Sequence, residues 1–203
     1  MPRPELNLTR EHTALIVNEC QNGVVGANSA VPAVAAAAAP VLPVIGRVAR
    51  AARKAGVPVV HLTYVPAFNG KSFNDNTPLQ QRISGVTSGW TADDRDTQVA
   101  DEIGVEATDL ILPRQSGMSP THGTQIFAIL RNIGVSTVVL TGVSLNVAIQ
   151  AAAIELADED FNVVVPRDTV AGTPPEYAES VLRHSLRFLA TITTSDDVIA
   201  AWS

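Results

Sequence analysis

Residues 138–154 read VVLTGVSLNVAIQAAAI, and their pattern is the most informative one in the chain about its fold class. A run rich in β-branched residues breaks at Thr141-Gly142, after which alanines recur with helical periodicity, so the stretch predicts a strand, a tight turn and a helix. In α/β proteins, strand ends and helix N-termini converge at such turns, and the unpaired backbone N–H groups there attract ligands. We therefore expect any chemistry of this chain between this turn and the ends of the neighbouring strands.

The rest of the chain alternates in the same way. Short apolar runs predict five further strands, at residues 14–18, 57–63, 110–112, 162–165 and 191–194. Helical patterns with their stop signals predict helices at residues 41–54, 124–132, 146–157 and 176–189. Six strands alternating with helices indicate one domain over residues 1–203, an α/β, three-layer, Rossmann-like sandwich around a six-stranded parallel sheet.

Residues 65–97 interrupt this alternation. They are polar, rich in Gly, Pro and Asn around Trp90, and show no clear periodicity. A segment of that length is typical of a functional or mobile element, so we expect a lid or an oligomer contact. A solvated surface loop is the open alternative.

Composition excludes several classes of protein. With 203 residues, 46% apolar and 17% charged, the chain is long enough for one buried core, and its formal net charge of −6 argues against nucleic acid as a partner. Residues 30–45 are mostly apolar but contain three prolines and are short for a bilayer, so we expect no membrane span. The polar start MPRPELNLTREH lacks an export signal, and we expect a cytoplasmic protein.

No cofactor or metal is expected from the motifs. The chain has no G-x-G-x-x-G after its first strand and no G-x-x-x-x-G-K-[ST], so dinucleotide and P-loop sites have no residue support. The four histidines lie far apart in sequence and lack H-x-x-x-H or H-x-H spacing. A metal site is therefore not predicted.

A serine nucleophile is one alternative. Residues 142–146, GVSLN, match the nucleophile-elbow pattern G-x-S-x-G except at Asn146, and Asp168 and His184 follow Ser144 in the chain order of a triad. However, Asn146 puts a side chain where the elbow needs glycine, and His184 falls within a predicted helix. The pattern leaves a serine hydrolase as a minor hypothesis.

Cys20 is a second candidate nucleophile, because it follows Glu19. Neighbours in an extended strand end point to opposite faces, so the two side chains should not share one pocket. We interpret Cys20 as a small buried apolar residue. It is the only cysteine in the sequence, so an intramolecular disulfide is excluded.

Three blocks of sequence resemble the isochorismatase-like family of cysteine hydrolases, which includes isochorismatases, nicotinamidases and related amidases. ALIVNECQNG is similar to the family's first strand, and SPTHGTQIFAILRNIGVSTVVLTGVSLNVAIQAAAIEL is similar to its S-x-F-x-G-T and T-G-V-x-x-x-x-C block. DFNVVVPRDTVAG with RHSLRFLATITTSDDVIA resembles its closing strand and helix. The resemblance spans nearly the whole chain and implies the family's fold.

The resemblance implies that all three residues of the family's aspartate–lysine–cysteine triad have changed. The aspartate falls on Glu19, which keeps a carboxylate, and the cysteine falls on Ala148, which has no nucleophilic atom. The lysine falls on Gln115 in an ungapped count and on Arg114 with a slip of one residue. We favour Arg114, because the site then keeps a cation.

The same resemblance implies the residues around the substrate. The Val143-Ser144 bond matches a non-proline cis peptide of the family, and the N-terminus of the following helix would face an anion. The expected substrate-binding residues are Gln21, Ser119, His122, Val143, Ser144, Asn146 and Val147.

Two functions of different class follow. An amidase of this family needs a thiolate, so Ala148 favours the chemistry of true isochorismatases, in which an acidic residue, here Glu19, protonates a vinyl ether while Arg114 holds a substrate carboxylate. The alternative is a non-catalytic member that binds a small molecule or a partner chain through the same crevice. In either case the resemblance implies a small-molecule ligand and a homo-oligomer, a dimer or a tetramer.

Overall fold

The structure is a computed structural model that describes residues 8–68 and 70–203. Residues 1–7 and 69 lie outside the described residues, and so do the predicted domain start at residue 1 and most of the polar N-terminal stretch. The predicted α/β fold, a parallel sheet flanked by helices, is confirmed.

In the part of the chain that the structure describes, the strand pairs of the sheet are all parallel. Six strands lie in the order β3-β2-β1-β4-β5-β7, and a short seventh strand, β6, pairs with β4. Their bounds are β1 Thr13–Asn18, β2 Val59–Tyr64, β3 Leu110–Arg114, β4 Thr137–Val143, β5 Asn162–Pro166, β6 Val170–Ala171 and β7 Thr191–Thr193. The six predicted strands are all present, and the count of six misses only β6, whose two residues are too few to give a periodic signal.

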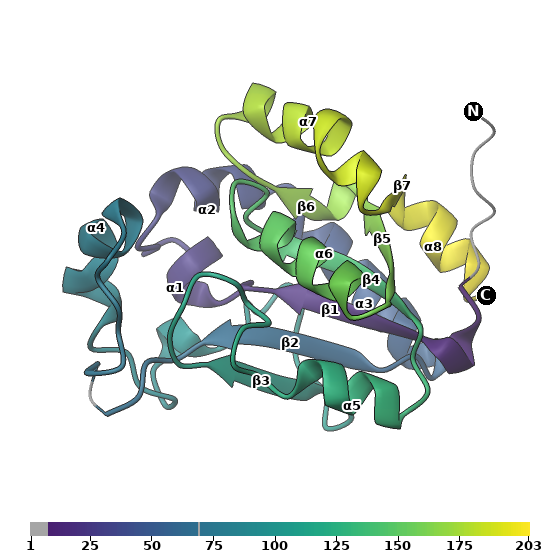
Figure 1. Ribbon diagram of the computed structural model, residues 1–203, viewed down its shortest axis with the longest axis horizontal. Helices are drawn as coiled ribbons and strands as arrows, with labels where there is room; N and C mark the ends of the chain where they lie inside the picture. Colours follow the sequence, from purple (N-terminus) through teal and green to yellow (C-terminus); the bar gives the residue numbers. More distant parts are fainter. Residues whose placement is uncertain (1–7, 69) are drawn as a thin grey trace.

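Helices cover both faces of the sheet (Figure 1). One face packs on α2 Pro32–Ala38, α3 Leu42–Ala55 and α8 Ser195–Ala201, and the other on α5 Ile126–Asn132, α6 Ala148–Asp158 and α7 Pro175–His184. In β1, Leu15 and Val17 belong to the first core while Ala14 and Ile16 belong to the second. Because successive side chains of a strand alternate between faces, a strand buried on both sides reads as an unbroken apolar run.

The central stretch differs in detail from its prediction. Strand β4 continues through Thr141 and Gly142 to Val143, and α6 begins at Ala148, two residues later than expected. Gly142 has a φ of 102°, and a Cβ there would lie 2.1 Å from the backbone oxygen of Asn18. The glycine therefore marks the close approach of β1 and β4 rather than the end of the strand.

Several short helices were not predicted. They are α1 Asn22–Val25, α2, α4 Pro78–Thr87, α8, and the 3₁₀ turns Arg10–His12, Arg95–Thr97, Arg167–Thr169 and Leu186–Phe188. The helix expected over residues 176–189 ends at His184, and a 3₁₀ turn follows it. Helices of one to three turns depend on tertiary contacts and caps, so their sequences carry weak periodicity.

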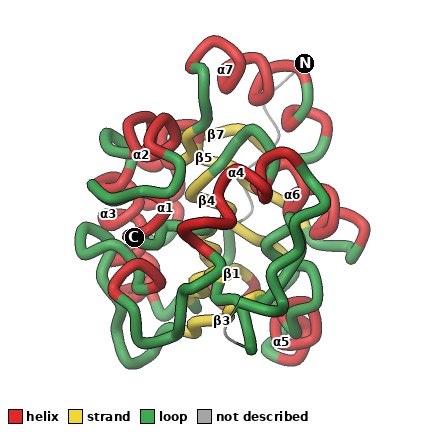
Figure 2. The backbone as a smooth tube through the Cα atoms, turned by 90° about the vertical axis from the view of Figure 1, so that its left-hand side faces the viewer, coloured by secondary structure: helices red, strands yellow, loops and turns green. Residues whose placement is uncertain are grey.

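Residues 65–97 contain α4, which lies beyond the carboxyl ends of the strands, at the left of Figure 1 and in front of the sheet in Figure 2. Thr77 caps this helix, because its side chain accepts a hydrogen bond from the backbone N–H of Gln80. The segment thus covers the edge of the sheet where strand ends meet.

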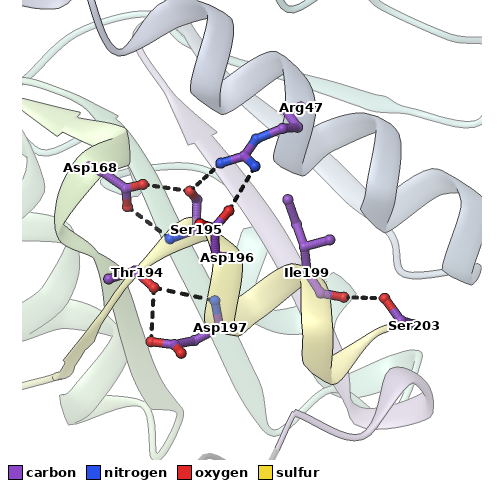
Figure 3. Close-up of polar contacts among 8 residues, drawn as sticks. All are labelled: Arg47, Asp168, Thr194, Ser195, Asp196, Asp197, Ile199 and Ser203. Carbon is purple, nitrogen blue, oxygen red and sulfur yellow. Dashed lines mark hydrogen bonds and ion pairs between the residues drawn. The ribbon is translucent and has the colours of Figure 1, made fainter.

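Polar contacts hold the start of helix α8 against α3 and against the 3₁₀ turn Arg167–Thr169 (Figure 3). The Asp168 carboxylate accepts hydrogen bonds from the backbone N–H of Ser195 at 2.8 Å and from its hydroxyl. Arg47 of α3 donates to the Ser195 hydroxyl and pairs with Asp196. Asp168 is therefore occupied in holding the start of α8.

Within the described residues, no single helix is long and apolar enough to cross a membrane. Only α2 and α3 taken together, with a bend of 59° between them, meet that criterion by length and composition.

Candidate functional site

A cavity of about 270 Å³ lies at the carboxyl ends of the strands. Its walls come from the end of β1, the ends of β2 and β3, the turn between β4 and α6, the segment that contains α4, and the part of the chain from α1 to α2. Most of the lining is apolar. The lining residues are Glu19, Val24, Ala30, Val31, Val34, Tyr64, Phe73, Leu79, Gln80, Ile83, Thr87, Trp90, Arg114, Gly117, Met118, Val143, Ser144, Asn146, Val147, Ala148 and Thr173.

Glu19 and Arg114 form an ion pair in this cavity. Nη2 of Arg114 lies 2.6 Å from Oε1 of Glu19, and the side chains are only 8% and 15% exposed for Arg114 and Glu19 respectively. The β2–β3 register places Arg114 opposite Tyr64, and the guanidinium carbon lies 4.6 Å from the centre of the Tyr64 ring. The arginine is thus held between a carboxylate and an aromatic face.

Burial dominates the protonation of this pair. Burial raises the pKa of Glu19, although the charge and the hydrogen bond of Arg114 oppose the change. Burial also raises the pKa of Tyr64 to about 12, against the charge of Arg114. Glu19 consequently holds a proton more readily than an ordinary glutamate does.

Arg114 has unused hydrogen-bonding capacity. Its Nε and Nη1 atoms are buried and meet no acceptor among the described residues. A buried donor without a partner costs about 1–3 kcal/mol, more when the group is charged. An anion entering the cavity would relieve part of this cost after a small shift of the guanidinium.

The turn between β4 and α6 forms the opposite wall. The Val143-Ser144 peptide bond is cis, as the resemblance implied. Asn146 fixes the turn, because its Oδ1 accepts a hydrogen bond from the backbone N–H of Thr173 at 2.9 Å and its Nδ2 donates to the carbonyl of Thr173. Ala148 is 4% exposed and presents its methyl group to the cavity.

Residues of the 65–97 segment close the cavity from outside. Phe73, Ile83 and Trp90 line it, and Trp90 is only 5% exposed. Asn74 ties the segment to the loop after β3, where its Oδ1 accepts from the backbone N–H of Gly117 at 3.0 Å. The solvated-loop alternative is wrong for this part of the segment, which forms a wall of the cavity.

The structure separates Arg114 from Gln115. Arg114 is the last residue of β3 and points to Glu19, whereas Gln115 lines a separate hollow with Phe68 and Trp90. Arg114 is therefore the residue of the two that reaches the cavity.

Gln21 lies beside the cavity but not in its lining. Its Nε2 donates to the carbonyl oxygens of Tyr64 and Thr97, both at 3.0 Å, and its Oε1 accepts from the N–H of Tyr64 at 2.6 Å. The expectation that it binds substrate is corrected, because its polar atoms hold backbone instead.

The structure also corrects the expectation for Ser119 and His122. Ser119 shares a hydrogen bond with Thr121 at 2.9 Å, and His122 lines a different hollow beside Glu155. The loop from Gly117 turns away after Met118, so these two side chains lie outside the cavity lining.

Comparison with known proteins identifies the family. The isochorismatase domain matches residues 13–197. This chain belongs to the isochorismatase family. Its relatives of known structure include a cysteine hydrolase from Pseudomonas syringae pv. phaseolicola 1448A, 21% identical over 100% of this chain and 98% of that one, with a TM-score of 0.82.

Two further similar proteins are an amidase of known structure and an uncharacterized member of the same family. N-carbamoylsarcosine amidase from Thermoplasma acidophilum is 26% identical over 91% of this chain and 97% of its own, with a TM-score of 0.72. The uncharacterized isochorismatase family protein YecD of Escherichia coli O157:H7 is 26% identical over 100 residues, 49% of this chain and 52% of that protein. The match thus spans about half the length of this curated relative.

In this isochorismatase-family chain the residues of the serine hypothesis do not come together. Ser144 lines the cavity, but Asp168 is bonded to Ser195 and His184 is the exposed last residue of α7. Cys20 is buried, and its thiol donates to the carbonyl of Asn18 at 3.4 Å. Burial raises the pKa of the Cys20 thiol, so it is not an activated nucleophile.

Some cavity residues of this isochorismatase-family chain were missed. Tyr64 directly follows the predicted second strand, so its place at the shared edge of the sheet could have been inferred. Phe73, Leu79 and Ile83 carry no such signal, because they reach the cavity only through the way residues 65–97 pack over the strand ends. Within residues 8–68 and 70–203, no three His, Cys, Asp or Glu side chains are grouped to hold a metal ion.

Proposed function

We propose that this chain is a hydrolase that acts on a small carboxylated substrate without a cysteine nucleophile, with Glu19 as its acid and base. One observation carries the proposal. The carboxyl group of Glu19 lies in a largely apolar cavity, paired with Arg114 at 2.6 Å, and the methyl group of Ala148 faces the same cavity.

Ala148 argues against amidase chemistry. By resemblance to T-G-V-x-x-x-x-C, it occupies the position of the family's nucleophilic cysteine. An amidase of this family forms an acyl-enzyme through a thiolate, and a methyl group offers no electron pair for that bond. The amidase among the relatives therefore supports a shared hydrolase scaffold rather than a shared reaction.

Hydrolysis of a vinyl ether needs an acid but no nucleophilic side chain. Glu19 would donate its proton to the terminal enol carbon, which leaves a cation shared between the adjacent carbon and the ether oxygen. Water would add to that carbon and return a proton to Glu19. The resulting hemiketal would collapse by breaking its carbon–oxygen bond, which yields a ketone and an alcohol. Glu19 ends the cycle protonated, as it began.

The environment of Glu19 supports its role as an acid. A general acid at neutral pH needs a raised pKa, and burial raises the pKa of Glu19 in spite of the neighbouring Arg114. Arg114 would bind the substrate carboxylate, since the planar guanidinium matches that group and two of its nitrogens lack partners among the described residues.

A non-catalytic binding protein is the second candidate. It is favoured by the buried Glu19–Arg114 pair itself, because such a pair can persist as a structural salt bridge in a site that has lost its chemistry. In that case the cavity would bind a small molecule or a partner chain and leave it unchanged.

Substitution of Glu19 separates these functions. Turnover is measured with wild type and with Glu19→Gln on isochorismate, which carries two carboxylates, on a vinyl ether that carries one carboxylate, and on a panel of amides. The proposal predicts loss of at least about a hundredfold in hydrolysis while ligand binding is retained. The matched control is Glu179→Gln, which breaks an Arg–Glu pair of similar length, 2.8 Å, on the surface.

Two outcomes would reject the hydrolase proposal. One is hydrolysis by Glu19→Gln at the wild-type rate. The other is the absence of turnover by wild type on every vinyl ether and amide in the panel, while ligand binding persists. The second outcome favours the non-catalytic candidate.

A further inference from the structure

The cavity holds one positive charge. Among the described residues that line it, Arg114 is the only cation and Glu19 the only acid. The two neutralise each other at 2.6 Å. A ligand carboxylate entering this space adds a negative charge for which no second cation is available.

The rest of the wall carries no charged side chain and is mostly apolar, with neutral polar side chains at Tyr64, Gln80, Thr87, Ser144, Asn146 and Thr173. Val31, Phe73, Ile83, Trp90 and Met118 face the same space, and they offer dispersion contacts rather than hydrogen bonds to a charged group. An uncompensated ionised group in such a place is costly, and it neutralises itself by changing its protonation. The ligand's body should therefore be apolar.

Two carboxylates then compete for one guanidinium. Nη2 of Arg114 is already bonded to Glu19, and the buried Nε and Nη1 are without partners among the described residues. Given the proposed role of Arg114 in binding a substrate carboxylate, we propose that the cavity takes a ligand with one carboxylate and an apolar body. We propose also that Glu19 takes up a proton as this ligand binds. The proton comes from solvent and neutralises Glu19, so that Arg114 pairs with the ligand.

The other groups near Glu19 do not replace it as the proton acceptor. Tyr64 faces it from β2, and burial raises the pKa of that phenol to about 12, so the ring is already protonated near neutral pH. Cys20 follows it in the chain, and its thiol is also protonated and directed to the carbonyl of Asn18. From α6, Ala148 contributes only a methyl group.

The test uses benzoate as the probe, with isothermal titration calorimetry across the neutral pH range. Wild type should bind benzoate with an affinity that falls, up to about tenfold per unit of rising pH, above the pKa of Glu19 in the free protein. On that slope, titrations in phosphate and in Tris at one pH should give close to one proton taken up per benzoate. A flat pH profile with no proton uptake would overturn the proposal, as would the absence of benzoate binding at millimolar concentration.

Variants test whether Glu19 takes up the proton and whether Arg114 binds the carboxylate. Glu19→Gln should bind benzoate with an affinity that no longer depends on pH, and Arg114→Gln should lose at least about tenfold in affinity. If Arg114→Gln fails to fold because it leaves Glu19 unpaired, the double variant Glu19→Gln/Arg114→Gln replaces it and should show the same loss. The controls Glu179→Gln and Arg167→Gln alter an exposed pair and should behave as wild type. A persistent pH slope in Glu19→Gln would overturn the assignment.

Probes of different charge test whether the cavity accepts only one carboxylate. Isophthalate adds a second carboxylate to the same ring, and benzamide removes the charge. Both should bind at least about tenfold more weakly than benzoate. Isophthalate would leave one of its carboxylates without a cation, whereas benzamide offers no anion, so that Arg114 would stay paired with Glu19. Equal binding of isophthalate would overturn the charge limit.

These measurements also separate the inference from the proposed function. Proton uptake with benzoate, together with unimpaired hydrolysis by Glu19→Gln, would reject the function and keep the inference. Loss of hydrolysis in Glu19→Gln, together with benzoate binding that takes up no proton, would reject the inference and keep the function.

Discussion

Gln21 satisfies both backbone groups of Tyr64 with a single buried amide. Its Oε1 accepts from the N–H of Tyr64 at 2.6 Å, and its Nε2 donates to the carbonyl of the same residue at 3.0 Å. The ring of Tyr64 in turn lies against the guanidinium of Arg114. Gln21 therefore positions the ion pair from behind the cavity, without lining it.

Gln21→Leu should loosen this support. The substitution keeps the volume of the side chain but leaves backbone groups of Tyr64 and Thr97 buried without partners, which costs about 2–4 kcal/mol. Urea denaturation measures the loss. Gln98→Leu, at an exposed position with one side-chain bond to Ala92, is the control and should cost less than about 1 kcal/mol. Equal losses in the two variants would contradict the role given to Gln21.

Gly23→Ala should distort the cavity from outside. A Cβ at this position in α1 would lie 2.3 Å from Cζ2 of Trp90, and the indole has to move. We expect a change in Trp fluorescence and at least about a tenfold loss of ligand affinity, since Trp90 is part of the lining. Gly85→Ala in α4 meets no atom within 4 Å and should be neutral or stabilising by up to about 1 kcal/mol. Wild-type fluorescence and affinity in Gly23→Ala would refute the expectation.

The sheet could be predicted from sequence because its signal is local. The run at residues 14–18 is apolar at nearly every position, and β1 is buried on both faces there. Where tertiary contacts decide, the prediction fails. Strand β4 runs through Gly142 because that glycine admits the backbone of Asn18, a neighbour that no periodicity reveals.

The site was predictable only in part for the same reason. Glu19 and Arg114 end neighbouring strands of one parallel sheet, so their convergence follows from the fold. Ser119 and His122 were expected at the cavity because, by resemblance, they lie in the loop that usually carries the family's lysine, and the direction of a loop cannot be read from the sequence. Trp90 lies against Gly23, a neighbour far away in the sequence that no local pattern reveals.

Ala148→Cys should restore a nucleophile. The residue faces the cavity at the start of α6, where a thiolate would be stabilised by the helix N-terminus. We expect hydrolysis of a simple amide at least about tenfold above wild type, with an acyl-enzyme detectable by mass spectrometry at the introduced thiol. Ala151→Cys, on the same helix but outside the lining, is the control. Amide hydrolysis by wild type through an acyl-enzyme would show that the chain uses another nucleophile.

Acid should weaken the fold through a buried network at the start of β3. Nε2 of His61 lies 3.0 Å from Oδ2 of Asp109, and Arg53 pairs with the same carboxylate at 2.7 Å. Burial lowers the pKa of His61, although Asp109 opposes the change. Burial would raise the pKa of Asp109, but hydrogen bonds from Arg53, the backbone N–H of Glu106 and His61 hold it below its ordinary value. Both groups therefore bind protons more weakly in the folded protein than in the unfolded chain.

The direction of the pH dependence follows from these shifts. A group with a lowered pKa in the folded state stabilises the fold above its unfolded pKa, and that contribution is lost as the pH falls through the folded value. His61 should act first, so the free energy of unfolding should fall below about pH 6.5, by up to about 1.4 kcal/mol per unit, and Asp109 should add to the loss below about pH 4. Between these pH values, the free energy of unfolding measured by urea denaturation should change less steeply with pH in His61→Gln than in wild type. In His184→Gln, a substitution at the exposed end of α7, it should change with pH as in wild type. The same slope in His61→Gln and wild type would mean that another group takes up the proton.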